Sequence, residues 1–395
     1  MDTPPPQKLL TRDFTLAFLA QFAFAAIFQL LLPTLPIYLS RQGATEIEIG
    51  VLVGVFGFIS VICRPFIGKA LTKVSERTFM IVGSMLNGAT SAAYLVIPIF
   101  WPLLILRLFQ GIAFAFYHTS SITFIANISP LVQRARILGY FSLAMNVAAA
   151  VAPPFGMFII NRFSFAHLFL VCTAIAVCQL VLSQRLGTRR IVPPPDQQAM
   201  DGFFLSREAL APSIINSLAL FLWAALTAFF PLYAVGQGMT NPGLFFTTMA
   251  IMLILGRGLG GRILDTYSKE KILIPCLAAC ILAMGLLAFS GTQFMFIVVA
   301  VIWGAGHAFL MPTLMAYTLE RVPTAGHAMG TFTAVSDLGL FLGPLTMGVL
   351  IHYTSYRAMF LCLALIGALN LIYFVVFVRK RTGRTPARAA HRGLS

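Results

Sequence analysis

The residue best placed to do chemistry is Asp337. It lies about ten residues into a run of apolar residues between positions 327 and 351, which is about 15 Å along a helix. In a lipid bilayer that depth is close to the midplane, where a carboxylate costs about 2.5–3.5 kcal/mol on insertion scales. Such a group must pair with a cation, face water or take up a proton. We predict that Asp337 carries protons; the alternative is an aspartic acid that hydrogen-bonds between helices for packing only.

Asn146 stands at the position that corresponds to Asp337 in an internal repeat of the chain. The other acidic residues lie in tails, loops or the ends of apolar runs. Two related polar groups are therefore expected at one depth, and only Asp337 is able to titrate.

Arg107 is the one basic residue that lies well inside an apolar run and away from the run ends that are expected to be cytoplasmic. Gln110 follows one helical turn later, so the two side chains share a helix face. We expect both to face a central cavity, where Arg107 influences a proton site or binds an anionic group. The alternative is that Arg107 extends to the membrane surface.

His307 and His118 fall near the middle of apolar runs, and Asn216 and Tyr117 are further polar side chains within such runs. An imidazole there either titrates or forms a hydrogen bond between helices as a neutral, packed group. His307 is the stronger candidate because Gly304 and Gly306 beside it leave room for a ligand. We count all four as candidate cavity residues.

The composition of the chain indicates that these residues lie in a membrane protein. Of 395 residues, 59% are apolar and 10% are charged, against about 25% charged in soluble domains. Within lipid, only helices and closed barrels satisfy the backbone, and uninterrupted apolar runs of about 20 residues favour helices. The six cysteines all lie in apolar runs, and we interpret them as free, buried side chains.

We predict an all-α membrane protein with twelve transmembrane helices in two pseudo-symmetric six-helix bundles. The predicted spans are 14–38, 47–67, 78–98, 102–126, 138–160, 166–186, 209–234, 244–262, 272–290, 293–319, 327–351 and 356–378.

The basic residues set the expected orientation. The net charge is +15, and Arg41, Arg162 and Arg357 are the basic residues that fall in the loops of one side. The loops and tails of the other side hold most of the remainder, which predicts that both termini are cytoplasmic. The same distribution argues against a nucleic-acid partner.

Five segments follow from these spans. We expect a cytoplasmic tail at 1–13, an N-terminal bundle at 14–186, a cytoplasmic linker at 187–208, a C-terminal bundle at 209–378 and a basic cytoplasmic tail at 379–395. The linker is the longest polar stretch and includes three consecutive prolines.

The two bundles are related by sequence. Arg64 and Gly68 recur as Arg257 and Gly261 in the second half of the chain. Other residues recur at nearly the same distance along the sequence, including Gly111 as Gly304, Pro130 as Pro323 and Pro153 as Pro344. A duplicated apolar chain is typical of transporters that bind their substrate between two like halves.

In these features the chain resembles the major facilitator superfamily over nearly its whole length. The loop from Gly68 to Arg77 is similar to the family's Gly-x-x-x-Asp-x-x-Gly-Arg-Arg/Lys motif but has Thr72 for the acid, Ser75 for the glycine and Glu76 for the first arginine. The later copy, from Gly261 to Asp265, keeps the acid.

Two further motifs resemble the proton-driven drug exporters of that superfamily. Residues 107–111 are similar to the Arg-x-x-Gln-Gly motif of proton-driven members. Residues 152–156 and the Gly343-Pro344 pair followed by Gly348 are similar to the exporters' Gly-Pro-x-x-Gly-Gly motif.

The resemblance implies a set of gating and packing residues. Arg262 and Asp265 are expected to latch the cytoplasmic gate, together with Arg64, Gly68, Arg257 and Gly261; for Arg64 and Arg257 the alternative is contact with lipid phosphate. Close helix packing or bending is expected at Pro153, Pro154, Gly156, Gly343, Pro344 and Gly348.

We therefore expect a multi-pass transporter of a bacterial inner membrane that exports a small solute against proton entry by alternating access. The alternatives are uncoupled or proton-symport uptake, lipid or glycolipid translocation and, from a different class, a membrane-embedded enzyme. The sequence has no phosphate-binding loop, metal-ligand cluster or nucleophile with a base partner. We expect no cofactor and no metal, and a monomer whose partners are its substrate, protons and the bilayer.

Overall fold

The computed structural model of the chain describes residues 11–71, 73–97, 100–130, 133–187, 207–259, 266–319 and 325–379. Regular secondary structure within these residues is helical. The first bundle contains α1 (Arg12–Arg41), α2 (Glu46–Ala70), α3 (Glu76–Ala93), α4 (Trp101–Ile128), α5 (Arg134–Arg162) and α6 (Phe165–Gln184). The second contains α7 (Arg207–Gly236), α8 (Gly243–Leu259), α10 (Lys269–Leu287), α11 (Gln293–Leu319), α12 (Ala325–Tyr353) and α13 (Tyr356–Tyr373), which continues into the π-helix η3 (Phe374–Arg379).

The predicted all-α membrane fold with two six-helix bundles is confirmed. Ten of the described helices are long and apolar enough to cross a bilayer, and α8 is apolar but shorter. The third predicted span, 78–98, is shorter in the structure because α3 ends at Ala93. There Tyr94 leaves the helix and its hydroxyl donates a 2.9 Å hydrogen bond to Gln110 of α4.

Capping residues at the helix starts and glycines in the turns separate consecutive apolar helices. Thr45 forms a capping box with Glu48 at the start of α2, and Ser75, Ser164 and Ser355 cap α3, α6 and α13 through their hydroxyls. The turns that follow α1 and α7 contain Gly43 and Gly238 at φ +87° and +84°. These glycines are equivalent in the repeat, and both turns need the left-handed conformation that glycine adopts without strain.

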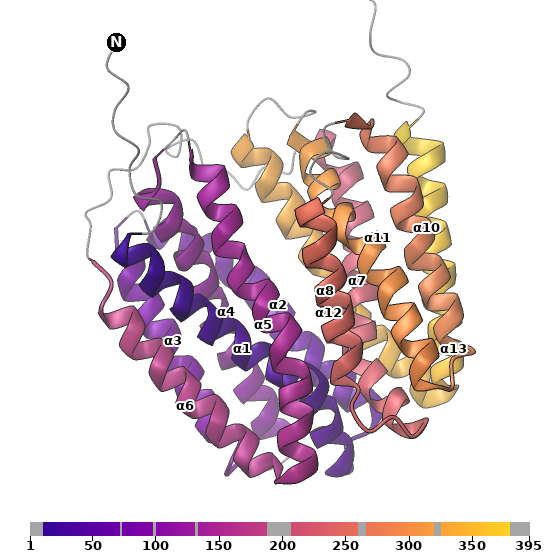
Figure 1. The fold of residues 1–395 in the computed structure, drawn as a ribbon, viewed down its shortest axis with the longest axis horizontal. Helices are drawn as coiled ribbons and strands as arrows, with labels where there is room; N and C mark the ends of the chain where they lie inside the picture. The colour runs from indigo at the N-terminus through magenta and orange to yellow at the C-terminus, as the bar shows by residue number, and fades with distance from the viewer. Residues whose placement is uncertain are drawn as a thin grey trace, which may run out of the picture.

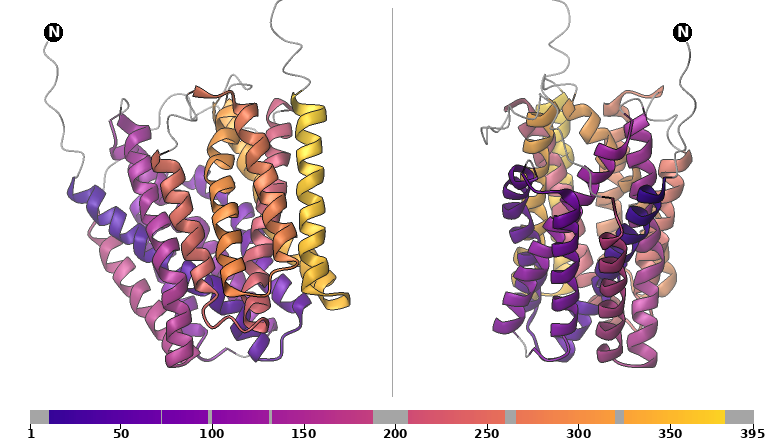
Figure 2. Two further views of the ribbon diagram at one scale, coloured as in Figure 1. Left: turned by 45° about the vertical axis from the view of Figure 1, so that its right-hand side comes forward. Right: turned by 90° about the vertical axis from the view of Figure 1, so that its left-hand side faces the viewer.

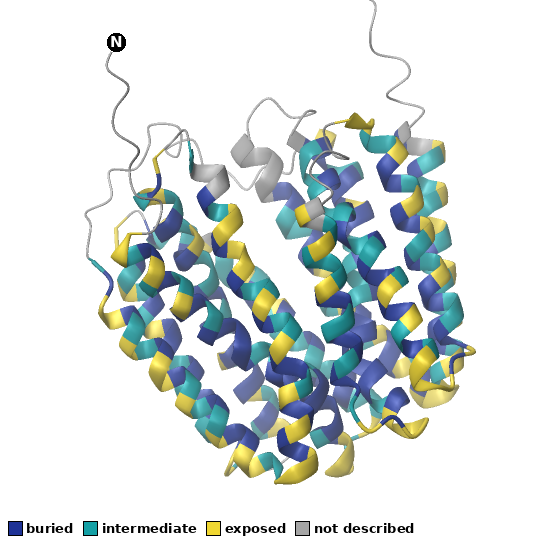
Figure 3. Cartoon of the chain, in the orientation of Figure 1, coloured by how far each residue is buried: buried dark blue, intermediate teal, exposed yellow. Residues whose placement is uncertain are grey.

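The two bundles lie side by side, with both described chain ends at one face of the molecule (Figures 1 and 2). We call this the terminal face and the opposite one the distal face. In Figure 1 the bundles meet toward the distal face and diverge toward the terminal face. Figure 3 shows buried residues concentrated inside each bundle and exposed ones along the outer helix surfaces.

The bundles contact each other mainly through two antiparallel helix pairs, α2 with α12 and α5 with α8. A β-carbon added to Gly50 would collide with the carbonyl oxygen of Pro344. A β-carbon added to Gly348 would lie 2.5 Å from the carbonyl oxygen of Glu46. Small residues therefore allow the backbones of α2 and α12 to touch, as expected in lipid, where close packing rather than water exclusion joins helices.

The α5–α8 pair adds hydrogen bonds to the same distal contact. Thr247 Oγ1 donates to the Ala150 carbonyl at 2.7 Å, and Asn161 Nδ2 donates to the Thr240 carbonyl at 2.8 Å. We refer to the contacts of α2 with α12 and of α5 with α8 together as the distal seam.

Candidate functional site

Arg64 and Asp337 form an ion pair that joins the two bundles. Arg64 Nη1 of α2 donates a hydrogen bond to Asp337 Oδ2 of α12. At 1.5 Å per residue, Asp337 lies about 18 Å along α12 from Ala325 and Arg64 about 27 Å along α2 from Glu46. Among the described residues, Asp337 is the acid that lies away from the first turn of its helix. The structure thus brings together the predicted proton carrier and a residue expected at the cytoplasmic gate.

The pair lies on the terminal side of the glycines through which α2 and α12 touch. Toward the distal face the α2 and α12 backbones touch, while a β-carbon added to Gly57 would be 3.4 Å from Leu340, an ordinary contact. Arg64 lies about two helical turns beyond Gly57, and its long side chain reaches Asp337 of α12. The ion pair therefore lies on the terminal side of these glycine contacts.

The pair is partly screened from its surroundings. The Asp337 side chain is 10% exposed and the Arg64 side chain is 29% exposed. Burying one charge without the other would be expensive, so each stabilises the charged form of its partner. Both side chains therefore keep some surface that the protein does not cover.

A second polar contact fixes α12 next to Asp337. Asn216 Nδ2 of α7 donates a 2.9 Å hydrogen bond to Ser336 Oγ, and both residues are buried. Asn216 therefore contacts the residue that precedes Asp337 rather than the carboxylate itself.

The structure places Arg107 within the first bundle. Its Nε donates to the Leu52 carbonyl at 2.7 Å, its Nη2 donates to the Val53 carbonyl at 3.4 Å and its Nη1 donates to Gln110 Oε1 at 2.5 Å. The guanidinium also lies 4.9 Å from the centre of the Phe56 ring. Arg107 is 6% exposed and Gln110 is fully buried. In this arrangement Arg107 ties α4 to the backbone of α2.

His118 and Tyr117 belong to a cluster of aromatic rings between α1, α2 and α4. The His118 ring stacks on Phe114 at 5.1 Å, and Tyr117 stacks on Phe24 at 4.5 Å. Phe28, Phe56 and Phe114 pack against one another with centroids 4.9–5.3 Å apart. We call these residues the aromatic cluster.

His307 occupies a comparable setting in the second bundle. Its ring stacks between Trp223 of α7 and Trp303 of α11, at 6.0 and 5.8 Å. His307 is half-buried, and Trp303 is fully buried. Because Phe114 is the equivalent of His307 in the repeat, the two bundles present stacked rings at related positions.

The remaining candidates are spread along the bundles. Asn146 is half-buried on α5 and has no hydrogen bond or ion pair to the described part of the chain. Gly68 lies in the last turn of α2 with open space around its α-carbon. Gly261, Arg262 and Asp265 lie outside the described residues, as does the side chain of Arg257.

The expected packing residues lie at helix contacts. Pro153 and Pro154 contact Gly243 across the seam, and Pro344 contacts Gly50. Gly156 lies against the Leu30 carbonyl of α1, and Gly343 lies against the Phe221 carbonyl of α7. Gly348 lies at the distal end of the α2–α12 contact.

Sequence reasoning missed Ser336, Trp223 and Trp303. Ser336 directly precedes Asp337, and a hydroxyl at this position in an apolar run could have indicated a second hydrogen bond between helices. The two tryptophans are two of only three in the chain. Their stacking on His307 depends on the relative rotation of α7 and α11, which the sequence pattern does not specify.

Comparison with known proteins places this arrangement in a family. The family model described as Major Facilitator Superfamily matches residues 17–344 and 243–394. The staphylopine export protein of Staphylococcus aureus (strain Mu50 / ATCC 700699) is 26% identical over 363 residues, which are 87% of this chain and 89% of that protein. The quinolone resistance protein NorA of Staphylococcus aureus (strain COL) is 25% identical over 346 residues, 81% of this chain and 85% of NorA.

Solved structures support the same fold. The nucleoside transporter NupG superimposes with a TM-score of 0.73 at 16% identity, covering 92% of this chain and 98% of that one. A POT family transporter in complex with a thioalcohol-conjugated peptide superimposes with a TM-score of 0.77 at 13% identity, covering 94% and 97%. Two bundles joined at a distal seam, with a family model that spans nearly the whole chain, identify this protein as a multi-pass membrane transporter of the major facilitator superfamily.

Proposed function

We propose that this transporter exports a small solute from the cytoplasm in exchange for protons, and that Asp337 exchanges the coupling proton. The observation that carries the proposal is the Arg64–Asp337 pair between the bundles. A transporter of this family works by rocking one bundle against the other around a central site. A titratable contact between the bundles is able to link protonation to that motion.

The physical basis is the cost of an uncompensated charge at this depth. With Asp337 ionised, the carboxylate and the guanidinium neutralise each other. Protonation of Asp337 removes the negative charge and leaves Arg64 to find water or another acceptor. The preferred separation of α2 and α12 therefore changes with the protonation of one group.

The described state fits one step of such a cycle. The bundles are in contact at the distal seam, and the partly exposed pair lies on the terminal side of its glycine contacts. If the terminal face is cytoplasmic, Asp337 has released its proton inward and the transporter is ready to accept solute from the cytoplasm. Separation of the distal seam would then expose Asp337 to the outside for protonation.

Two lines of support bear on direction and orientation. The names of the staphylopine export protein and the quinolone resistance protein describe export and drug resistance in those relatives. The excess of basic residues in the loops and tails at the terminal face supports a cytoplasmic location for that face in the inner membrane.

Stacked rings in both bundles suggest the type of solute. His118 and Phe114 of the aromatic cluster, and His307 with Trp223 in the other bundle, supply flat apolar surfaces beside imidazole nitrogens. Such surfaces suit small amphipathic solutes that combine an apolar ring or chain with a polar group. We expect a monomer to be sufficient, since each chain has both halves.

The test is transport by purified protein in proteoliposomes under an imposed pH gradient. A fluorescent quinolone and the hits of a thermal-shift screen of amphipathic solutes serve as cargo. We expect wild-type transport to follow the pH gradient, and Asp337→Asn to lose gradient-driven transport while still exchanging cargo across the membrane.

Glu76→Gln is the matched control. Glu76 is also a buried acid, but it is bonded to Asn127 within the first bundle and lies at a helix start. We expect this variant to keep gradient-driven transport. Unchanged proton dependence in Asp337→Asn would remove Asp337 from coupling, and wild-type exchange that ignores the gradient would indicate an uncoupled transporter.

A further inference from the structure

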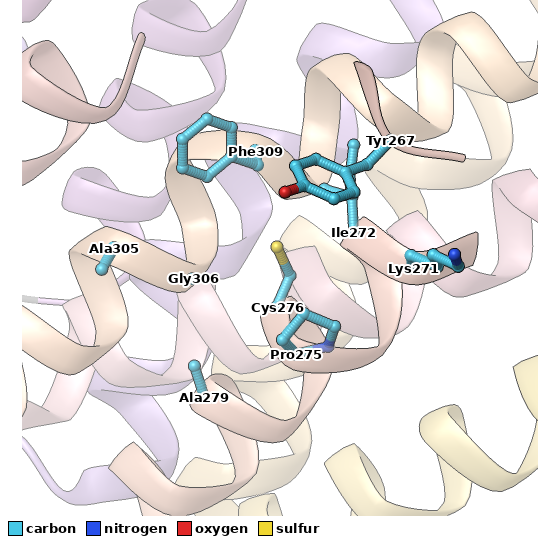
Figure 4. A pocket seen from close by; sticks show the side chains of 9 residues that line it. All are labelled: Tyr267, Lys271, Ile272, Pro275, Cys276, Ala279, Ala305, Gly306 and Phe309. Atoms are coloured by element: carbon cyan, nitrogen blue, oxygen red, sulfur yellow. The ribbon is translucent and has the colours of Figure 1, made fainter. Parts of the chain in front are cut away.

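A lipid-facing slot opens between α10 and α11 near the terminal face. The cavity has a volume of about 410 Å³, and its walls include Pro275, Cys276, Ala279, Ala305 and Phe309. Figure 4 shows the ring of Tyr267 above the slot, with the Cys276 sulfur directed toward the same space. Neither the proton pair nor the aromatic cluster contributes to it.

The slot arises from the way the two helices cross. A β-carbon added to Gly306 would lie 2.8 Å from Ala279 Cβ and 3.0 Å from the Cys276 carbonyl oxygen, so α10 and α11 touch at this glycine. From that contact toward the start of α10 the helices separate. Small side chains on both walls leave the space between them open.

The surroundings of the slot identify it as a membrane-facing feature. Helix α10 packs on α11 and α13 and makes no substantial contact with the described part of the first bundle. Its exposed positions Lys271, Pro275 and Leu282 recur at helical spacing along one side. Val298 and Val301 continue an exposed apolar stripe along α11. In a transporter embedded in a bilayer, these surfaces contact acyl chains.

The entrance of the slot has the composition of a membrane–water boundary. Tyr267 is 55% exposed, and Lys271 is exposed with no ion pair to the described residues. Lys269 and Glu270 lie beside it at the start of α10 and balance each other in charge. Lys271 therefore adds a net positive charge next to an apolar slot, as at sites where head groups meet acyl chains.

We propose that the slot between α10 and α11 binds one acyl chain of an anionic phospholipid whose phosphate group contacts Lys271. The apolar walls take the chain, Tyr267 lies over it at the depth of the glycerol backbone, and Lys271 interacts with the head group. The occupant also supports α11 on the side opposite His307, because Ala305 and Gly306 line the slot while His307 stacks inside the bundle.

The test is native mass spectrometry of the delipidated, detergent-purified transporter titrated with phosphatidylglycerol and, separately, phosphatidylcholine. We expect wild-type protein to retain one phosphatidylglycerol at least several-fold more strongly than phosphatidylcholine. Ala305→Phe fills the slot and should reduce retention of both lipids. Lys271→Glu should abolish the preference for phosphatidylglycerol and leave phosphatidylcholine binding unchanged.

Two control variants separate the slot from general surface effects. Val298→Phe adds the same ring elsewhere on the α11 stripe, and Lys73→Glu makes the same charge change in the exposed loop after α2. Both should retain lipid as the wild type does. Thermal unfolding of each variant in detergent shows that the protein is folded. Equal retention by Ala305→Phe and wild type, or an unchanged lipid preference in Lys271→Glu, would overturn the proposal.

Discussion

At the scale of single residues, the two halves of the Arg64–Asp337 pair depend on each other. Neither charge forms a second ion pair within the described part of the chain, and Asp337 is mostly buried. Removal of one partner leaves the other charge poorly compensated, whereas removal of both leaves two neutral side chains. This asymmetry distinguishes an interacting pair from two residues that happen to be close.

We expect Arg64→Gln to lower the thermal stability of the transporter in nanodiscs more than the double variant Arg64→Gln/Asp337→Asn does. The interaction energy from the double-mutant cycle should be about 0.5–1 kcal/mol, near the low end for contacting residues because Arg64 is partly exposed. The same cycle measured at a pH low enough to protonate Asp337 should give no interaction. Additive effects at both pH values would contradict a charge-dependent contact.

Arg107 carries a different expectation, because its hydrogen bonds stay inside the first bundle. We predict that Arg107→Met destabilises the fold by about 1–3 kcal/mol, since the Gln110 amide oxygen loses a charged donor and the Leu52 carbonyl loses its side-chain partner. The measurement is the midpoint of unfolding in detergent, paired with transport per folded molecule. A normal midpoint with lost transport would instead support the cavity role that we expected from the sequence.

At the scale of helices, the distal seam depends on glycines that let backbones touch. A β-carbon at Gly54 would lie 2.8 Å from the Phe341 carbonyl oxygen, and one at Gly50 would lie even closer to Pro344. These contacts lie between the bundles and not within one of them. A larger residue should therefore separate the bundles without unfolding either.

We predict that Gly50→Val shifts the transporter away from the state closed at the distal face. Spin labels at Gln42 and Tyr353, at the distal ends of α1 and α12, should show a longer and broader distance distribution by pulsed electron paramagnetic resonance. Gly57→Ala is the control, because its added carbon would make only an ordinary 3.4 Å contact with Leu340. Identical distributions for Gly50→Val and wild type would show that the seam tolerates the added bulk.

The helices were largely predictable from sequence, and the contacts between them were not. Apolar runs and capping residues such as Thr45 and Ser164 mark where a span begins, because lipid requires every backbone group to be bonded within its own helix. The pairing of Arg64 with Asp337 depends on the register of α2 against α12 across the two bundles. The direction of Arg107 depends on the rotation of α4, which periodicity leaves open in a helix that is apolar on all sides.

At the scale of the whole molecule, the repeat explains why the seam has two similar parts. Helices α2 and α5 of the first bundle contact α12 and α8 of the second, and these four helices occupy equivalent positions in the two halves. Pro153 and its equivalent Pro344 both lie at these contacts. Only one of the two parts has a titratable pair in the described residues, since Asn146 takes the place of Asp337 on α5. Under the proposed function, the duplicated fold allows the two bundles to move against each other, and the loss of symmetry at this position is where we propose that protons are coupled.

The orientation of the molecule is testable from the same geometry. We predict that the distal face is outside, because the basic residues of its loops are few and those of the terminal face are many. In a background without the six native cysteines, Thr240→Cys in the turn between α7 and α8 should react with a membrane-impermeant maleimide in intact cells. Ser75→Cys, in the turn between α2 and α3, should react only after the cells are permeabilised. Transport of cargo by both variants confirms that the labelled protein is assembled. Labelling of Ser75→Cys in intact cells would reverse the orientation and, with it, the direction that we propose for proton release from Asp337.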